Sequence, residues 1–459
     1  MKKKIILLSV FAILTAGIFA QTLSKFKERE RVVFLGNSIT DGGHYHSFIW
    51  LYYMTRFPDM ELRIMNAGIG GDTAYDMYKR LDGDVFSKGP TTLVVTFGMN
   101  DSGYMEYNSD KGKEFGEEKY KECFNNYKLM EKRLADLPNT KVVMLGGSPY
   151  DEYAKINNTA LRGKNAVMQR IVDFQKQSAQ QHGWEFIDFS KPMSAINQKF
   201  REKDSTFTLC GRDRIHPDND GHMVMAYLFL KEQGFNGSKV ADVEINAGRE
   251  QVMKSENCTV TNLKKNGKAL TFDYLANALP YPLDTINRGW ESQKSQSDAV
   301  KYVSFMDEMN QELLKVSGLK GNYKLYIDDI EIGTWSATDL AKGINLACES
   351  KTPQYQQAMA VMHLNEYRWE IERNFRDYAW VQFGFFQKKG LLFANNRQAI
   401  EAMDKEIANN IWLKIHRDNY SRMMHKSIRD AREQEMEVLI SQIYNINKPV
   451  VRKVKLTKI

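Results

Sequence analysis

The sequence predicts an α/β protein in which a parallel β-sheet is covered by helices on both faces, followed by a smaller β region and a helical region. Three observations lead to this prediction. Residues 31–235 alternate short, continuously apolar segments with longer helix-like segments, a pattern typical of a parallel sheet buried on both faces. Beyond residue 236, short β-like segments and turns replace that alternation, and two long helical stretches follow. A chain of 459 residues also exceeds one ordinary hydrophobic core.

The first region predicts three layers, with a sheet between two layers of helices. Its five strands are short apolar runs at residues 31–35, 62–66, 92–97, 141–145 and 185–187. Helix-like segments lie between them at about 74–81, 119–137 and 161–181. In folds of this kind ligand sites lie at the carboxyl ends of the strands. The residues that directly follow the strands are therefore the first candidates for a functional site.

The second half of the chain predicts a small β-containing region over 236–352 and a helical region over 353–459. Short β segments are expected at 240–246, 258–263, 269–274 and 323–335, with turns at Asn266-Gly267 and Asp328-Asp329. Helical stretches at 353–387 and 397–444 predict an αα-hairpin that turns near Gly390. Aromatic residues recur at helical spacing between 355 and 386, which indicates a core between helices rather than a binding platform.

The N-terminus predicts an exported protein. Three lysines after Met1 precede an apolar run over 5–19, and the small residue Ala20 precedes Gln21. These are the parts of a secretory signal peptide, here residues 1–20, with residues 21–30 leading into the first domain. The run is shorter than the roughly 20 apolar residues of a membrane-spanning helix, and no cysteine stands at its end. We therefore expect a periplasmic or secreted bacterial protein with no membrane attachment after cleavage.

Composition excludes some partners and leaves others open. The net charge of +7 is spread along the chain without a basic arm or a nucleic-acid-binding motif, so no nucleic-acid partner is expected, although a weak preference for acidic glycans stays open. The four cysteines form no C-x-x-C pair and give a zinc site little support; they are either free thiols or one of three disulfide pairings. His44 and His46 lack a third ligand nearby, which favours a pocket wall or the surface over a metal site.

Four blocks of residues carry the chemistry. Gly36–Gly42, Asn66–Thr73 and Gly98–Asp101 follow the first three predicted strands, and Asp213–Pro217 stands late in the domain. A serine at a strand-to-helix turn presents its hydroxyl as a nucleophile. Glycines let the backbone approach a ligand, and an asparagine amide can donate to a developing oxyanion. An aspartate three residues before a histidine can hold the imidazole that takes the serine proton.

In this order the four blocks resemble the SGNH (GDSL-like) hydrolase superfamily, over roughly residues 31–235. The resemblance implies a flavodoxin-like α/β/α domain with a catalytic triad of Ser38, His216 and Asp213. It also implies an oxyanion hole built from Ser38, Gly71 and Asn100, with Gly70 as the alternative glycine. The family commonly has Gly-Asp-Ser in the first block, whereas this chain has Asn37 before the serine.

The resemblance implies an acyl-ester hydrolase that needs no metal and no organic cofactor. The leading hypothesis is an esterase that deacetylates carbohydrate, acting on a small-molecule or glycan acyl ester. A lysophospholipase-like hydrolase of lipid esters or thioesters is the first alternative. The second is a catalytically silent glycan-binding protein on an esterase scaffold. The acyl group, the alcohol, the oligomeric state and the role of residues 236–459 stay open.

Overall fold

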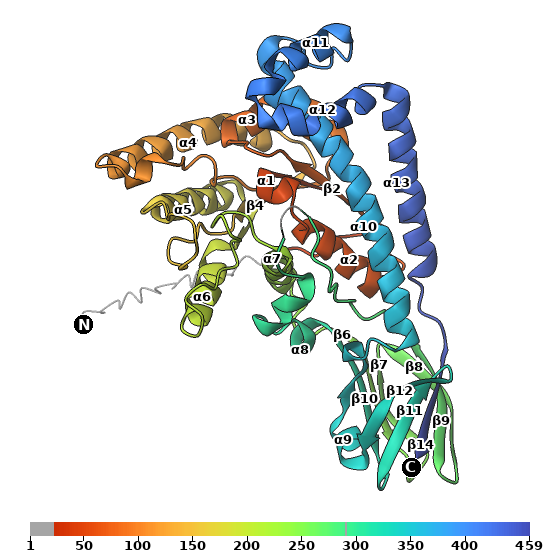
Figure 1. The fold of residues 1–459 in the computed structure, drawn as a ribbon. Helices are drawn as coiled ribbons and strands as arrows, with labels where there is room; N and C mark the ends of the chain where they lie inside the picture. Colours follow the sequence, from red (N-terminus) through yellow and green to blue (C-terminus); the bar gives the residue numbers. More distant parts are fainter. Residues whose placement is uncertain (1–22, 290–291) are drawn as a thin grey trace, which may run out of the picture.

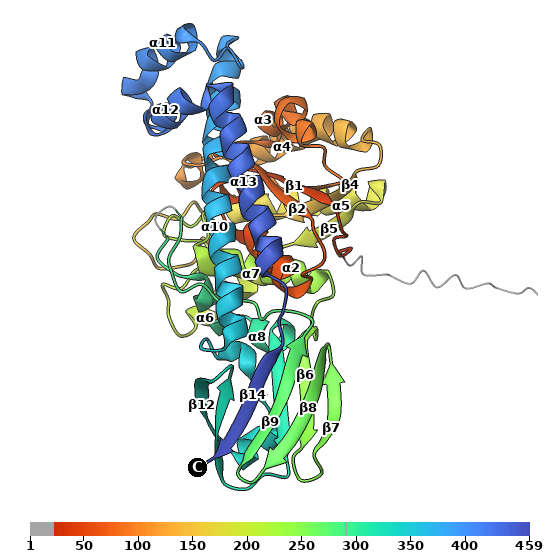
Figure 2. The same cartoon turned by 90° about the vertical axis from the view of Figure 1, so that its right-hand side faces the viewer.

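The computed structural model describes residues 23–289 and 292–459, so the predicted signal peptide over 1–20 lies outside the described residues. An α/β domain forms the upper body of the molecule in Figure 1, a β-sandwich lies below it, and two long helices run from the sandwich along the domain (Figures 1 and 2). The predicted order of a parallel-sheet domain, a β region and a helical region is confirmed.

The α/β domain is built on five parallel strands in the order β2-β1-β3-β4-β5. Val32, Val33, Phe34 and Leu35 are fully buried, as expected of a strand covered on both faces. Helices α4 and α5 pack together on one side of the sheet, and α2 and α7 pack together on the other (Figure 1). The strands are β1 (Arg31–Gly36), β2 (Arg63–Gly68), β3 (Thr92–Val95), β4 (Lys141–Gly146) and β5 (Glu185–Asp188). The helices are α1 (Ser38–Asp41), α2 (Tyr45–Arg56), α3 (Ala74–Lys79), α4 (Gly112–Ala135), α5 (Lys164–His182), α6 (Ser190–Arg201) and α7 (Asn219–Glu232).

The sandwich consists of two sheets, with strand orders β13-β10-β6-β7 and β12-β11-β14-β9-β8. Its buried residues form a hydrophobic core separate from that of the α/β domain. The elements are β6 (Lys239–Asn246), β7 (Gln251–Glu256), β8 (Cys258–Asn266), β9 (Ala269–Ala276), α8 (Phe305–Met309), β10 (Gln311–Ser317), β11 (Asn322–Ile327), β12 (Ile330–Ser336), α9 (Ala337–Lys342), β13 (Ile344–Asn345) and β14 (Arg452–Lys458).

Strand β14 corrects the prediction that 353–459 is helical to its end. It lies in the middle of its sheet and pairs antiparallel with both β11 and β9. Val454 and Leu456 are buried while Lys453 and Lys455 are exposed, the alternation of a strand with one covered face. The C-terminus of the chain therefore returns to the sandwich (Figure 2).

The helical region consists of α10 (Pro353–Ala379), α11 (Arg397–Glu406), α12 (Ile411–Met423) and α13 (Lys426–Ile446). Helix α10 continues into a π-helical segment, Trp380–Phe386, and packs lengthwise against α13 (Figure 1). The expected αα-hairpin is thus present, but α11 and α12 are inserted at its tip. Residues of both long helices belong to the core of the α/β domain, among them Val361, Met362, Ile440 and Ile443. The helical pair is therefore an integral wall of that domain.

Two further expectations concern cysteines and membranes. Of the options left open for Cys123, Cys210, Cys258 and Cys348, the structure has all four as free thiols. Across residues 23–289 and 292–459, no helix combines the length and apolar character needed to cross a bilayer.

Candidate active site

The three side chains expected to form a triad meet at the carboxyl edge of the sheet. Ser38 is the first residue of α1, directly after β1, and its Oγ lies 2.7 Å from Nε2 of His216. Nδ1 of His216 lies 2.5 Å from Oδ2 of Asp213. The imidazole therefore bridges the hydroxyl and the carboxylate. In this arrangement it can accept a proton from the serine while its other nitrogen donates to the carboxylate.

The loop that carries Asp213 holds its carboxylate in place. Oδ1 accepts the backbone N–H groups of Ile215 and His216, each at 2.9 Å. Partial burial works to raise the pKa of Asp213, but these bonds and the contact with His216 outweigh it and leave that pKa below its ordinary value. Asp213 is therefore the ionised partner of the imidazole at neutral pH.

Arg214 fixes the turn between the two triad residues. It adopts a left-handed backbone conformation with a φ of 70°, and its buried guanidinium donates to the carbonyl groups of Asp151, Ala154 and Asn158. Gly211 starts the same loop, and a Cβ there would lie 2.0 Å from the carbonyl oxygen of His216. The loop thus accepts only glycine at its start.

The backbone beside Ser38 distinguishes the two candidate glycines. Ser38 opens α1, so its N–H has no acceptor within the helix, while Asn37 caps the helix by accepting the N–H of Ile39 at 3.1 Å. The N–H of Gly70 is donated to Oδ2 of Asp41 at 3.1 Å and is thereby engaged. Gly71 makes no such bond within the described residues and has open space beside its Cα. This geometry favours Gly71 as the oxyanion donor over Gly70.

Asn100 is held so that one amide hydrogen stays available. Its Oδ1 accepts from the hydroxyl of Tyr104 at 2.8 Å, and its Nδ2 donates to the carbonyl of Asp72 at 2.9 Å. An amide nitrogen carries two hydrogens, so the second can point toward a bound oxyanion. The neighbouring Asp101 accepts the N–H groups of Ala74 and Gly98 and so orients the loop.

Helix α10 contributes two side chains that bind the second of the four blocks, Asn66–Thr73. The sequence did not identify these two residues. Glu372 accepts the backbone N–H of Asn66 at 2.8 Å. Arg376 donates to the carbonyl groups of Asn66 and Gly68 at 3.1 and 3.0 Å. These side chains lie more than 300 positions from their partners, and nothing local in the sequence marks them.

The histidines considered for a metal site are buried instead of forming a pocket wall or the surface. Nε2 of His44 lies 3.2 Å from Oε2 of Glu366, and the His44 ring stacks on Trp369 with 4.0 Å between centroids. His46 contacts the carbonyl oxygen of Thr40 at 3.1 Å. Within the described residues, no group of three or more His, Cys, Asp or Glu side chains is placed to hold a metal ion.

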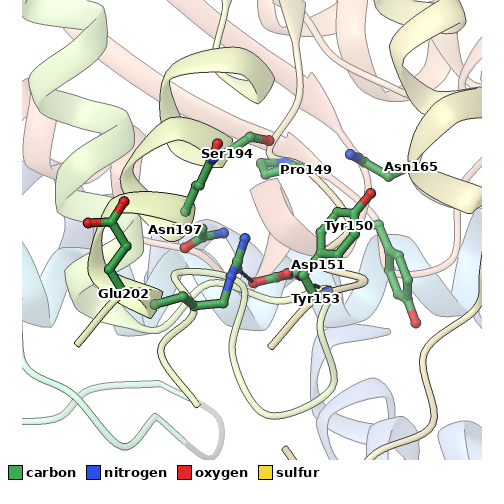
Figure 3. A pocket seen from close by; sticks show the side chains of 10 residues that line it. Pro149, Tyr150, Asp151, Tyr153, Asn165, Ser194, Asn197 and Glu202 are labelled. Carbon is green, nitrogen blue, oxygen red and sulfur yellow. Dashed lines mark hydrogen bonds and ion pairs between the residues drawn. The ribbon is translucent and has the colours of Figure 1, made fainter. Parts of the chain in front are cut away.

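A hollow of about 600 Å³ adjoins the triad loop without reaching Ser38. Figure 3 shows its lining, with Tyr150 and Tyr153 on one side and Ser194, Asn197 and Glu202 on the other. Arg201, which also lines the hollow, forms an ion pair of 2.7 Å with Asp151. The N–H of Asp151 donates to the carbonyl of Arg214, so the hollow rests against the back of the loop that carries Asp213.

Comparisons with known proteins cover both halves of the chain. Residues 34–224 match the GDSL-like Lipase/Acylhydrolase family, and residues 359–448 match the Diltiazem deacetylase C-terminal helical domain. A solved gut microbial diltiazem-metabolizing enzyme is 69% identical, with a TM-score of 0.94, over 96% of this chain and 100% of its own. An acetylxylan esterase of Geobacillus stearothermophilus is 26% identical over 46% of this chain and 97% of its own. A solved structure of an acetylxylan esterase from that organism is 23% identical, with a TM-score of 0.37, over 46% of this chain and 96% of its own.

Proposed function

We propose that this chain, a member of the SGNH (GDSL-like) hydrolase superfamily and an enzyme that hydrolyses ester bonds, removes acetyl groups with Ser38 as nucleophile and His216 as its base. The observation that carries this proposal is the unbroken relay of contacts from Ser38 Oγ through the imidazole to Asp213. Acetyl as the acyl group is supported by the matched diltiazem deacetylase C-terminal domain and by the acetylxylan esterase relative.

In the proposed reaction, Nε2 of His216 takes the proton of Ser38 as its Oγ attacks the ester carbonyl. The negative charge on the carbonyl oxygen is then met by the N–H groups of Ser38 and Gly71 and by the amide of Asn100. The imidazolium returns its proton to the leaving alcohol, and a water molecule repeats the sequence on the acetyl-serine. Each oxyanion donor of this kind is worth about 3 kcal/mol of transition-state stabilisation.

We assign small-molecule acetyl esters, diltiazem among them, as the first class of substrate. The support is the 69% identity to the diltiazem-metabolizing enzyme over nearly the whole chain, helical region included. O-acetylated carbohydrate is the second class, supported by the acetylxylan esterase relative, whose similarity covers 46% of this chain. Rates of acetate release from diltiazem and from acetylated xylo-oligosaccharides would rank the two classes. Faster release from the oligosaccharides would reverse our order.

Replacement of the nucleophile tests the proposal directly. We expect Ser38→Ala to lower kcat for p-nitrophenyl acetate and diltiazem by roughly 10⁵- to 10⁶-fold, to the background rate. The control is Ser205→Ala, which removes an exposed hydroxyl outside the site and should leave the rate unchanged. Equal rates for wild type and Ser38→Ala would refute the esterase mechanism at this site and favour a silent binding protein. A preference for p-nitrophenyl octanoate over the acetate would favour the lipid hydrolase.

Export of the enzyme is a separate part of the proposal. It is supported by the lysines after Met1, the apolar run over 5–19 and Ala20 before Gln21. Expression in a bacterial host followed by N-terminal sequencing should give a mature chain that starts at Gln21. A chain that keeps residues 1–20 in the cytoplasm would contradict export.

A further inference from the structure

The peptide bond between Gly70 and Gly71 is held by a side chain of the helical region. Nε1 of Trp380 donates a hydrogen bond of 3.1 Å to the carbonyl oxygen of Gly70. That carbonyl and the N–H of Gly71 belong to one planar trans peptide group, in which the two point in opposite directions. A donor that fixes the carbonyl therefore also fixes the direction of the Gly71 N–H.

This peptide needs such a restraint because its own residues provide little. Gly71 has a φ of 88°, and a Cβ on it would meet no atom within 4 Å. Two adjacent glycines can rotate the peptide plane between them at low cost. The restraint also lies close to the nucleophile, since a Cβ built on Gly70 would be 4.0 Å from both Ser38 Cβ and Trp380 Cδ1.

The same helix face holds the rest of this loop. Glu372, Arg376 and Trp380 are spaced four residues apart, so they share one side of the helix. Glu372 and Arg376 bind the backbone of the second block as described above. Arg373 forms an ion pair with Asp41, whose Oδ2 in turn accepts the N–H of Gly70. The N–H of Gly70 is thus held through Asp41, which pairs with Arg373, and its carbonyl is held directly by Trp380.

Trp380 is itself firmly placed. It is the first residue of the π-helical segment, a type of irregularity found frequently at functional sites. Its indole also packs against His416 of α12, with 4.8 Å between ring centroids. The helical region therefore places the indole N–H of Trp380 in a fixed position at the edge of the site.

We infer that Trp380 is a positioning residue of the esterase, which orients and polarises the Gly70–Gly71 peptide so that the Gly71 N–H serves as an oxyanion donor. The inference rests on the proposed function, in which Gly71 supplies that N–H. A hydrogen bond to the carbonyl strengthens the N–H of the same peptide group as a donor, because bonds in such chains polarise one another. The effect belongs to the transition state, where the charge on the oxygen is largest.

The test is Trp380→Phe, which keeps an aromatic ring but removes the N–H donor together with part of the indole's volume. We expect kcat for p-nitrophenyl acetate to fall about 3- to 10-fold, with KM changed less than about twofold. Affinity for a boronic acid that forms a tetrahedral adduct with Ser38 should fall by the same factor as kcat/KM. The matched control is Trp369→Phe on the same helix, whose Nε1 has no hydrogen-bond partner among the described residues. This control should keep the wild-type kcat.

The outcomes separate this inference from the proposed function. Inactive Ser38→Ala together with a Trp380→Phe enzyme of wild-type kcat would overturn the role of Trp380 and leave the esterase mechanism standing. Active Ser38→Ala would overturn both. An equal loss of kcat in Trp369→Phe would also overturn the inference. So would a loss of kcat in Trp380→Phe that is accompanied by a lowered melting temperature, because Trp380 would then have only a packing role.

Discussion

The buried carboxylate of Asp84 is one of the groups that tie the helical region to the α/β domain. Its two oxygens contact Arg376 of α10 at 2.7 Å, Arg80 at 2.5 Å and Lys88 at 2.8 Å. Burial works to raise the pKa of Asp84, but these three cations outweigh it and hold that pKa well below its ordinary value. Because Arg376 also binds the carbonyl groups of the second block, Asp84 indirectly supports the active-site loop.

We predict that Asp84→Asn lowers the free energy of unfolding by about 3–5 kcal/mol at pH 7, because it leaves the buried guanidinium of Arg376 without its counter-charge. The sign of the pH dependence follows from the lowered pKa. The stabilisation by Asp84 is complete above the pKa of an unfolded aspartate, about 3.9, and is lost as the pH falls through the lower folded value. Chemical unfolding of wild type and variant at pH 7, 5 and 3 should therefore show a difference that persists at pH 5 and shrinks at pH 3.

Asp82→Asn is the matched control for this experiment, since Asp82 is exposed and, among the residues that the structure describes, pairs with Arg133 alone. Its effect should stay within about 0.5 kcal/mol. A difference between wild type and Asp84→Asn that grows toward pH 3 would contradict the assignment of a lowered pKa.

At the scale of elements, the sequence predicted what is local and missed what depends on distant contacts. The five strands of the α/β domain are continuous apolar runs, and each lies within two residues of its predicted bounds. The blocks around Ser38 and His216 are recognisable because each motif is short and follows or precedes a predicted element. Trp380 was read as helix core, which the spacing of aromatic residues favours. Its bond to Gly70 spans 310 positions, and no local pattern encodes it.

The helical region shows the same limit. The stretch predicted as one helix over 397–444 is divided into α11, α12 and α13. Asn410 caps α12 by accepting the N–H groups of Trp412 and Leu413, and an asparagine at this point is a helix-start signal that the sequence contains. Strand β14 was missed for a different reason: seven residues at the end of a helical region form a strand only because β9 and β11 offer open edges.

At the scale of the whole molecule, the sandwich anchors one end of helix α10, whose other end leads to Trp380. Helix α10 begins next to the sandwich, α13 ends next to it, and β14 continues from α13 into the middle of a sandwich sheet (Figures 1 and 2). The far end of α10 holds Trp380 against Gly70. Loss of the sandwich would release both helices at one end. We therefore expect the site to depend on the sandwich, although none of the site residues named above lies in the described part of it.

Leu456→Ala tests this dependence. Leu456 is fully buried in β14, and its truncation should cost about 2–5 kcal/mol of sandwich stability. We expect the variant to have wild-type kcat at 25 °C, but to lose activity on heating at the same lowered temperature at which its β-structure unfolds, followed by far-UV circular dichroism. Lys455→Ala, on the exposed side of the same strand, should change neither temperature. Activity that survives the unfolding of the sandwich would show that α10 keeps Trp380 in place without the sandwich. The contacts around Asp84 would then be sufficient to hold α10 against the α/β domain.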